Sequence, residues 1–521
     1  MSRFRYQFTL VFIALMFLGL VAKLFYFQVI KKAEFEVDRS QFAKKTPISR
    51  GEIVDRNNKI LAVDMNKHTL EFNPIQSLED KEKLFSNLQS IINLKSRNLI
   101  SANRSITLAH NLNKGQADKI KKLNSKYLYL RKIRSRIYPQ GALASHVLGY
   151  VDLYGKARQG VEYEYEDFLQ EHSTASLVLS LDSRLQNYAQ KALAQRLEET
   201  HAKQGAVVVM KVATGELLTW AVKPDFDPNK YFDFDSSYRN NWSLVDVYQP
   251  GSVFKIMTVA SALDSMTIDR FYTYKDEGFI KVDNWKIKNH DYVAKVTKAE
   301  TLNLEGLFAR SSNPFSAHLA LKMGPDIFYK YIRAFGFGEK TGVEISGETN
   351  GIVRPPQKWR NSDTATTGIG QGMISVTPLQ LLTAVNAVAN NGYKVKPTLF
   401  KVNDYSSIEK ESVILEENAL LIRKLLTNAT AYNIRERHSI SANVPGLSIA
   451  GKTGTAQKLK AGGGYSRKNT IASYVGFFPA ENPLYTVLVV IDDPETDGRW
   501  GDTVAGPVFN KVAAYMKSLY L

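Results

Sequence analysis

Apolar and polar positions recur along the chain with two periods, which together predict a mixed α/β protein. After Asp182, apolar residues return at i, i+3, i+4 and i+7, the spacing of an amphipathic helix. Residues 206–211 and 216–222 are apolar runs on either side of a turn signal, as in a β-hairpin. Residues 470–478 and 485–491 are rich in β-branched and aromatic side chains and predict two further strands.

Residues 8–30 form a long apolar stretch that no charge interrupts before Lys23. Its 23 residues are enough to cross a bilayer, which needs about 20. A cleaved signal peptide is the alternative interpretation, but no small-residue cleavage site follows the stretch. Basic residues flank it on both sides, so charge does not fix its orientation. We expect residues 1–30 to comprise a short cytoplasmic tail and a retained transmembrane anchor.

The chain of 521 residues is too long for one typical core, so we expect more than one folded unit. Residues 31–174 are mixed and basic and contain no set of residues that suggests chemistry. Residues 175–521 contain the helix and strands above, with further helix-like segments at 252–264 and 378–389. We therefore predict an anchor, an intermediate domain at 31–174 and an α/β domain at 175–521.

The net charge of +17 suits an anionic partner, which could be nucleic acid, an acidic membrane surface or a phosphate-bearing substrate. Residues 119–136 hold eight basic residues and no acidic one, which fits either a solvated basic face or contact with such a partner. The chain has no cysteine, which rules out disulfides, thiolate metal sites and a cysteine nucleophile. The eight histidines are scattered, without an H-E-x-x-H pattern, so we expect no metal and no cofactor.

The first candidate for chemistry is Ser252-Val253-Phe254-Lys255, at the start of an almost entirely apolar helix. A spacing of three places the hydroxyl and the amine on the same side of the first turn. A desolvated lysine has a lowered pKa and can act as a base towards that hydroxyl. Ser-x-x-Lys alone is weak evidence, because both residues are common.

Two further motifs strengthen this candidate. Ser311-Ser312-Asn313 follows it, and Lys452-Thr453-Gly454-Thr455 comes later, after a strand-like lead-in. Ser-x-x-Lys, Ser-x-Asn and Lys-Thr-Gly in this order are the motif set of penicillin-recognising serine enzymes. The middle motif is Ser-Ser-Asn here instead of Ser-Asp-Asn.

The chain resembles class B penicillin-binding proteins over nearly its whole length. Other stretches similar to boxes of that family's pedestal and transpeptidase domains are residues 50–57, 138–150, 160–162, 224–229, 370–372, 376–380, 493–494 and 506–509. The last two of these are similar to the division (septal) type. The resemblance implies a transpeptidase domain with a central antiparallel sheet and surrounding helices, together with an elongated pedestal domain at 31–174.

The resemblance also implies a role for each motif residue. Ser252 would attack the D-Ala-D-Ala carbonyl of a stem peptide, with Lys255 as its base. Ser311 would pass a proton to the leaving amine, and Asn313 would hold the Lys255 amine and the substrate amide. Lys452 would supply positive charge near Ser311.

The remaining motif residues would bind the substrate. Thr453 would bind its carboxylate, and Gly454 would allow close approach. The backbone N–H groups of Ser252 and Thr455 would form an oxyanion hole.

The implied partners are peptidoglycan stem peptides, lipid-linked precursor strands, β-lactam antibiotics and the membrane. A polytopic glycosyltransferase of the shape, elongation, division and sporulation (SEDS) class and other division proteins are implied as well, and nucleic acid is not. The expected location is the bacterial cytoplasmic (inner) membrane, with a single pass and the catalytic domain on the extracytoplasmic side.

Three other functions remain alternatives at this point. A membrane-bound β-lactamase or β-lactam sensor shares the acyl-serine chemistry, although Asn313, the pedestal-like boxes and the chain length favour a transpeptidase. A catalytically idle scaffold is disfavoured because every motif position is filled. Residues 446–453 also match the P-loop pattern of ATPases. A P-loop needs an apolar strand before it and a helix after it, whereas residues 439–445 are polar and Gly454 follows at once.

Overall fold

The computed structural model describes residues 2–26, 49–73, 77–92, 94, 104–294, 296–459, 464–496 and 498–521. Helix α1 (Ser2–Phe25) covers most of the predicted span at 8–30, of which residues 27–30 lie outside the described part. Within the described residues, no helix is both long and apolar enough to cross a membrane.

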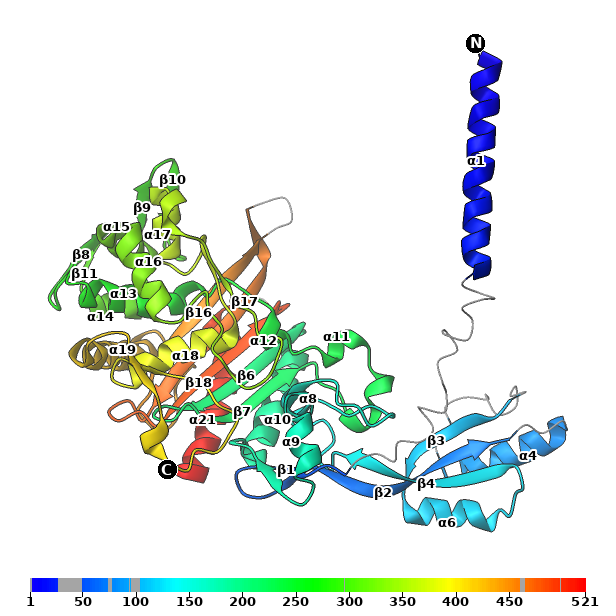
Figure 1. Cartoon of the computed structure of the whole chain (residues 1–521). Helices are drawn as coiled ribbons and strands as arrows, with labels where there is room; N and C mark the ends of the chain where they lie inside the picture. The colour runs from blue at the N-terminus through cyan, green and yellow to red at the C-terminus, as the bar shows by residue number, and fades with distance from the viewer. Residues whose placement is uncertain are drawn as a thin grey trace.

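The largest unit is built on a five-stranded antiparallel sheet (Figure 1). Its strand order is β16–β17–β18–β6–β7, so the hairpin β6–β7 pairs with strands from the far end of the chain. The predicted hairpin and both predicted C-terminal strands are confirmed. The bounds are β6 (Gln204–Lys211), β7 (Leu217–Lys223), β16 (Ala450–Leu459), β17 (Tyr465–Phe478) and β18 (Tyr485–Asp492).

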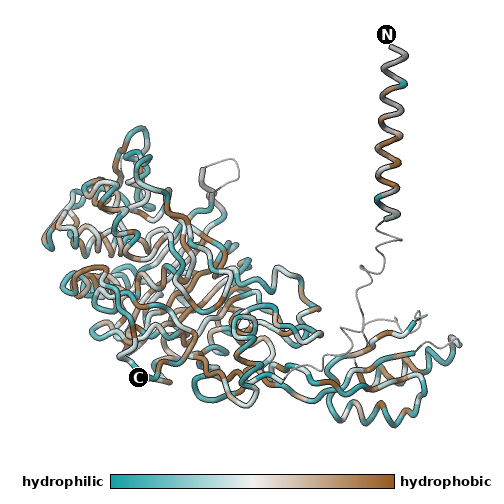
Figure 2. The backbone as a smooth tube through the Cα atoms, in the orientation of Figure 1, coloured by the Kyte–Doolittle hydropathy of each residue, from teal (hydrophilic) through white to brown (hydrophobic). Residues whose placement is uncertain are grey.

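Alternation along the strands explains why this sheet is covered on both faces. In β6, Val207 and Val209 belong to one buried cluster, whereas Val208 and Met210 belong to another. Successive side chains of a strand point to opposite faces, so β6 carries apolar residues on both. Figure 2 shows hydrophobic residues concentrated along these central strands.

Helices from the two ends of the unit cover the sheet face that carries Val207 and Val209. Helix α10 (Ser183–Thr200), capped by Asp182 as predicted, packs against β7 and against α21 (Gly506–Tyr520). The other face carries a helical lobe that contains the Ser252 segment. Its elements are η3 (Gly251–Phe254), α13 (Lys255–Asp264), α14 (Leu304–Arg310), α15 (Asn313–Met323), α16 (Pro325–Ala334), α17 (Asn361–Thr367), α18 (Pro378–Ala389) and α19 (Glu416–Glu436).

Short elements connect these layers. The lobe holds the hairpins and pairs β8 (Tyr274–Asp276), β9 (Phe279–Val282), β10 (Trp285–Lys288), β11 (Glu300–Leu302), β12 (Ile352–Val353), β13 (Ile374–Ser375), β14 (Tyr393–Val395) and β15 (Lys410–Ser412). The short helices are α7 (Ser145–Leu148), α8 (Gly160–Glu164), α9 (Glu166–Glu171), η2 (Pro228–Asp233), α11 (Ser236–Arg239), α12 (Trp242–Val245), η4 (Pro356–Lys358), η5 (Tyr405–Ser407) and α20 (Gly501–Val504).

A second sheet forms the part that we call the pedestal (Figure 1). Its long strand β2 pairs with β1, β3 and β4, and β1 also pairs in parallel with β5. Helices α4 and α6 accompany the sheet, and its own apolar cluster includes Leu70, Phe72 and Leu88. The bounds are β1 (Glu52–Val54), β2 (Ile60–Phe72), α4 (Leu78–Gln89), β3 (Ile106–Leu112), α6 (Lys114–Lys122), β4 (Leu128–Ile137) and β5 (Ser176–Val178).

A buried set of charges joins the base of the pedestal to the helices that follow it. Arg136 on β4 donates to Glu162 on α8 at 2.6 Å and to Asp64 on β2 at 3.2 Å. Arg50, just before β1, pairs with Glu166 at 2.5 Å. Because Arg50, Arg136 and Glu162 are buried, each of these charges depends on its partners in place of water.

Candidate active site

Ser252 lies on the 3₁₀ turn η3, directly before the buried helix α13. The turn begins at Gly251, whose φ of +59° favours glycine and whose N–H donates to the Gly370 carbonyl at 3.0 Å. A Cβ on Gly370 would lie 2.2 Å from the Gly251 oxygen. The loop at 370–372 therefore supports the Ser252 turn by close backbone contact, and Gln371 from the same loop lines the cavity beside Ser252.

Lys255 is fully buried one turn further on, at 0% exposure. Its amine donates to the Asn313 Oδ1 at 2.7 Å and to the Ser311 carbonyl at 2.5 Å, and it lies 3.2 Å from the Ser311 Oγ. The first two motifs of the sequence therefore meet at this amine.

The backbone shape of the second motif explains this convergence. Ser311 adopts a left-handed conformation, φ 52°, which ends α14 and turns the chain into α15. Ser312 caps α15 by accepting from the Phe315 N–H at 3.1 Å, and its hydroxyl donates to the buried Asp276 at 2.5 Å. The middle serine of this motif is thus a structural cap, which leaves Ser311 and Asn313 facing Lys255.

The hairpin β9–β10 holds Asn313 from its other side. The Asn313 Nδ2 donates to the Lys288 carbonyl at 2.7 Å, and its backbone N–H donates to the Asn289 Oδ1 at 2.8 Å. Asn289 in turn donates to Asp276 at 3.0 Å. Because its oxygen and its amide nitrogen are both bound, Asn313 has a fixed orientation towards the Lys255 amine.

The third motif lies on strand β16, paired with β17 along its length. A Cβ on Gly454 would lie 2.3 Å from the Ser473 Oγ and 2.8 Å from the Val253 Cγ2, so only glycine lets β16 approach the Ser252 turn this closely. The Thr455 Oγ1 accepts from the Gly501 N–H at 3.0 Å. Since the supposed nucleotide loop runs into a sheet strand instead of a helix, the P-loop interpretation is wrong.

Two buried amines share this site, and both have lowered pKa values. Burial lowers the pKa of Lys255 well below its usual range, and the nearby charge of Lys452 lowers it further. Burial, with Arg437 as a second cause, lowers the pKa of Lys452 to about 7. A desolvated amine favours its neutral form, so Lys255 is suited to accept a proton.

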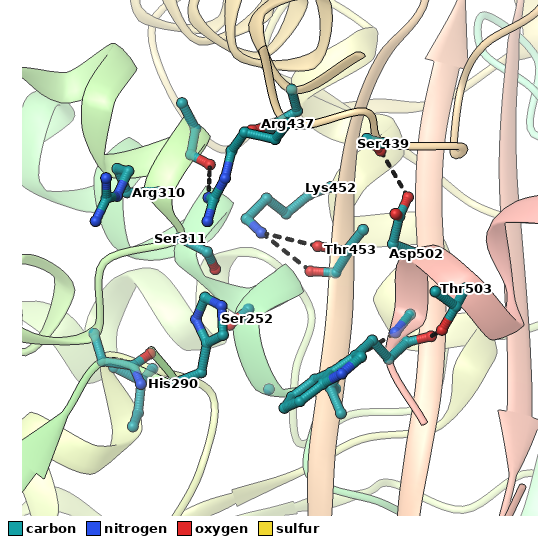
Figure 3. A pocket seen from close by; sticks show the side chains of 18 of the residues that line it. Ser252, His290, Arg310, Ser311, Arg437, Ser439, Lys452, Thr453, Asp502 and Thr503 are labelled. Atoms are coloured by element: carbon teal, nitrogen blue, oxygen red, sulfur yellow. Dashed lines mark hydrogen bonds between the residues drawn. The ribbon is translucent and has the colours of Figure 1, made fainter. Parts of the chain in front are cut away.

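A cavity of about 410 Å³ opens between the helical lobe and β16 (Figure 3). Ser252, Ser311, Asn313, Lys452, Thr453 and Thr455 all line it, whereas Lys255 lies behind its wall and Gly454 is not among the lining residues. The sequence motifs gave no sign of several other lining residues: His290, Arg310, Arg437, Trp500, Asp502 and Thr503.

The unpredicted residues come from loops near the three motifs. Arg437, at the end of α19, donates to the Ala309 carbonyl at 3.2 Å and so bridges α19 to the turn that carries Ser311. The His290 and Trp500 rings lie 5.8 Å apart at the cavity edge. Within the described residues, no group of three or more His, Asp or Glu could hold a metal ion.

Comparison with known families decides what this site belongs to. Residues 205–514 match the penicillin binding protein transpeptidase domain, and residues 45–179 match the penicillin-binding protein dimerisation domain. The chain is a class B penicillin-binding protein. This penicillin-binding protein is accordingly a transpeptidase of the α/β fold predicted from its sequence.

Several characterised proteins resemble this penicillin-binding protein along most of its length. Stage V sporulation protein D of Bacillus subtilis is 30% identical, over 98% of this chain and 85% of that protein. The peptidoglycan D,D-transpeptidase FtsI of Escherichia coli is 28% identical, over 91% of this chain and 84% of that protein. The crystal structure of penicillin binding protein 3 from Mycobacterium tuberculosis with aztreonam has a TM-score of 0.71 and 26% identity, covering 91% of this chain and 97% of that one.

Proposed function

We propose that this transpeptidase cross-links peptidoglycan stem peptides through an acyl ester on Ser252. The observation that carries the proposal is the Lys255 amine, which is buried, hydrogen-bonded to Ser311 and Asn313, and next to the cavity that Ser252 lines. Because burial favours the neutral amine, Lys255 can take the hydroxyl proton of Ser252 at neutral pH.

In the first half-reaction, the Ser252 Oγ attacks the carbonyl between the two terminal D-alanines and loses its proton to Lys255. The backbone N–H groups of Ser252 and Thr455 stabilise the oxyanion, where losing one donor typically costs about 10²–10³ in rate. As the C–N bond breaks, the proton passes by way of Ser311 to the departing amine. The terminal D-alanine leaves, and the stem peptide stays esterified to Ser252.

In the second half-reaction, the amine of another stem peptide attacks the ester carbonyl. Its proton returns to Ser252, the C–O bond to the serine breaks, and a new peptide bond joins the two stems. Before this, in the first half-reaction, Thr453 binds the terminal carboxylate of the donor peptide, next to the positive form of Lys452. A β-lactam acylates Ser252 in the same way but stalls there, because its leaving group stays tethered.

The described lining of the cavity offers no uncommitted carboxylate to a fast β-lactamase. Efficient hydrolysis needs a base beside the ester that activates water. Among the described residues that line the cavity, Asp502 is the sole carboxylate. It accepts from the Ser439 hydroxyl at 2.6 Å and the Ser441 N–H at 2.9 Å, which commits it to holding the loop between α19 and β16.

For the cellular setting, we propose a septal enzyme of the cytoplasmic membrane. Residues 1–30 would anchor the chain, with the catalytic domain on the extracytoplasmic side, and lipid-linked precursor strands would supply the substrate. A SEDS-type glycosyltransferase and other division proteins would be its partners. The similarity to FtsI and the apolar stretch at 8–30 support these assignments.

The test is labelling with a fluorescent penicillin, followed by peptide mass spectrometry to locate the adduct. We expect a long-lived adduct on Ser252 that the Ser252→Ala variant lacks. An adduct that turns over within seconds would favour a hydrolase. Absence of any adduct from folded protein would rule out the acyl-serine mechanism.

A further inference from the structure

A second cavity, of about 470 Å³, lies apart from the catalytic one, between the tip of the hairpin β9–β10 and the start of α17. Trp285 and Trp359 both line it. The rest of its lining is polar, with charged, amide and hydroxyl side chains: Asp283, Asn284, Arg360, Asn361 and Ser362.

Trp285 is unusual for its place on the hairpin. It shares a strand face with Ile287, which is buried against α15 and α17 in a small cluster with Ala317 and Ala365. Trp285 nevertheless remains 66% exposed. An exposed indole on the inward-facing side of a strand forgoes the free energy that burial would supply, which is expected where a ligand covers it.

A hydrogen bond joins the hairpin tip to the start of α17. The Asp283 carboxylate accepts from the Ser362 N–H at 2.9 Å, and Asp283 itself takes a left-handed conformation, φ 52°. Trp359 is fixed by its indole N–H, which donates to the Arg354 carbonyl at 3.1 Å. The Trp359 wall therefore has a fixed orientation before any ligand binds.

The lining favours a carbohydrate. A sugar ring has one face of apolar C–H groups, which can stack on an indole, and an edge of hydroxyl or amide groups, which need donors and acceptors. An apolar peptide would leave the amides and charges of this lining unpaired at a cost. We propose that this cavity, the hairpin-tip cavity, is a subsite for the glycan strand of peptidoglycan, with Trp285 as its stacking platform.

The position of the hairpin-tip cavity agrees with this assignment, which rests on the proposed function. Trp285 precedes Asn289 by four residues, or about 13 Å of extended strand, and Asn289 holds the active-site residue Asn313. A stem peptide of four extended residues also spans about 13–14 Å. The two lengths are comparable, so a stem peptide that runs along the hairpin from the Asn313 end would bring its own sugar towards Trp285.

Both walls of the cavity also continue into the catalytic site. The hairpin leads through Lys288 and Asn289 to Asn313. Helix α17 leads to Gly368 and Gly370, whose carbonyls accept from Thr258 and from the Gly251 N–H beside Ser252. A glycan held here would contact the same two elements that position the acylation machinery.

The test is binding of peptide-free glycan strands, released from peptidoglycan by an amidase and end-labelled with a fluorophore, to the full chain in detergent micelles. Fluorescence anisotropy should show saturable binding, weakened about tenfold or more in Trp285→Ala and largely kept in Trp285→Tyr, which preserves a stacking ring. Phe271→Ala is the matched control, because Phe271 is 80% exposed but outside this cavity.

Binding of glycan needs no acylation, so the same titration on Ser252→Ala separates this proposal from the proposed function. If chains that still form the penicillin adduct bind no glycan, the subsite proposal is overturned and the proposed function stands. Binding that Trp285→Ala leaves as tight as Phe271→Ala would also overturn it and would leave the exposed indole to a protein partner. A missing adduct with intact glycan binding would instead contradict the acyl-serine mechanism.

Discussion

Two lysines with lowered pKa values lie in one site, where positive charge on Lys452 disfavours protonation of Lys255. Burial is the main cause of both low pKa values; in addition, the charge of Lys452 lowers the pKa of Lys255, and that of Arg437 lowers the pKa of Lys452. The mechanism needs a neutral Lys255 and benefits from a charged Lys452. The positions of the exposed Arg437, of Lys452 and of the buried Lys255 relative to one another therefore affect which lysine carries a proton at neutral pH.

The first prediction concerns the pH dependence of acylation. The positive form of Lys452 is lost as pH rises through its pKa of about 7, so the rate of penicillin acylation should fall over that range. Arg437→Gln removes a charge that lowers this pKa, so the fall should move to higher pH. Stopped-flow labelling across the pH range measures both profiles.

Arg435→Gln provides the control, because Arg435 lies on the same helix but is 72% exposed and paired with Glu436. Its profile should match that of the unchanged protein. If Arg437→Gln left the pH range of the fall in acylation rate unchanged, Lys452 would not be the group whose titration causes that fall.

The second prediction concerns Gly454. An added methyl would overlap Ser473 and Val253, so Gly454→Ala should push β16 away from the Ser252 turn and slow acylation by about 10²-fold. Penicillin-labelling rates measure this loss. Gly115→Ala is the matched control, because its Cβ would meet ordinary contact at 3.4 Å inside α6 and should leave acylation unchanged. Equal rates in the two variants would contradict the argument.

At the scale of elements, Asp276 ties three segments together. This buried carboxylate ends β8 and accepts from Ser312 at the start of α15, from Asn289 after β10 and from the Gly278 N–H. None of these donors belongs to the reaction, yet the active-site residue Asn313 begins one of the three segments and is supported by Asn289 in another.

The third prediction is that Asp276→Ala lowers the free energy of unfolding by about 2–3 kcal/mol, because it leaves buried donors without an acceptor. It should also slow acylation, since Asn313 loses its support. Urea unfolding and penicillin labelling measure the two effects. Glu409→Gln, at an exposed position, should change neither, and a normal acylation rate in Asp276→Ala would show that Asn313 needs no such support.

Local patterns were sufficient to predict many elements but not the whole site. The apolar run of β6 and the cap at Asp182 appear in adjacent residues, so the sequence reveals them. The first turn at Ser252 is 3₁₀ instead of the predicted α-helix, because Gly251 and the Gly370 loop shape it through tertiary contact. Residues such as Arg437, Trp500 and Asp276 reach the site only through folding, and no local period marks them.

At the scale of the whole molecule, the buried charges at the pedestal base are a vulnerable point. Glu162 has no exposed surface, and Arg136 is its closest cation, at 2.6 Å. Removing one member of a buried pair leaves the other charge desolvated, which typically costs about 3–5 kcal/mol.

The fourth prediction follows from this pairing. Arg136→Met should destabilise the chain by about that amount, and the double variant Arg136→Met/Glu162→Gln should recover part of the loss, because the orphaned charge is gone. Chemical unfolding gives the free energy of unfolding of the unchanged protein, the single variant and the double variant. Arg131→Ala, on the same strand but 60% exposed, should cost less than about 1 kcal/mol. A double variant less stable than the single one would argue against charge burial as the cause.

Strand β2 has a mechanical consequence. Its 13 residues span about 43 Å, paired with β1 at one end and with β4 over the rest. The chain just after β1 is bonded to the start of α10, where the Asp55 carboxylate accepts from the Ser183 N–H at 3.0 Å. A force along β2 would act in shear on many of the hydrogen bonds between strands at once. The far end of the pedestal and the part of the catalytic domain at the start of α10 should therefore move together as one stiff unit.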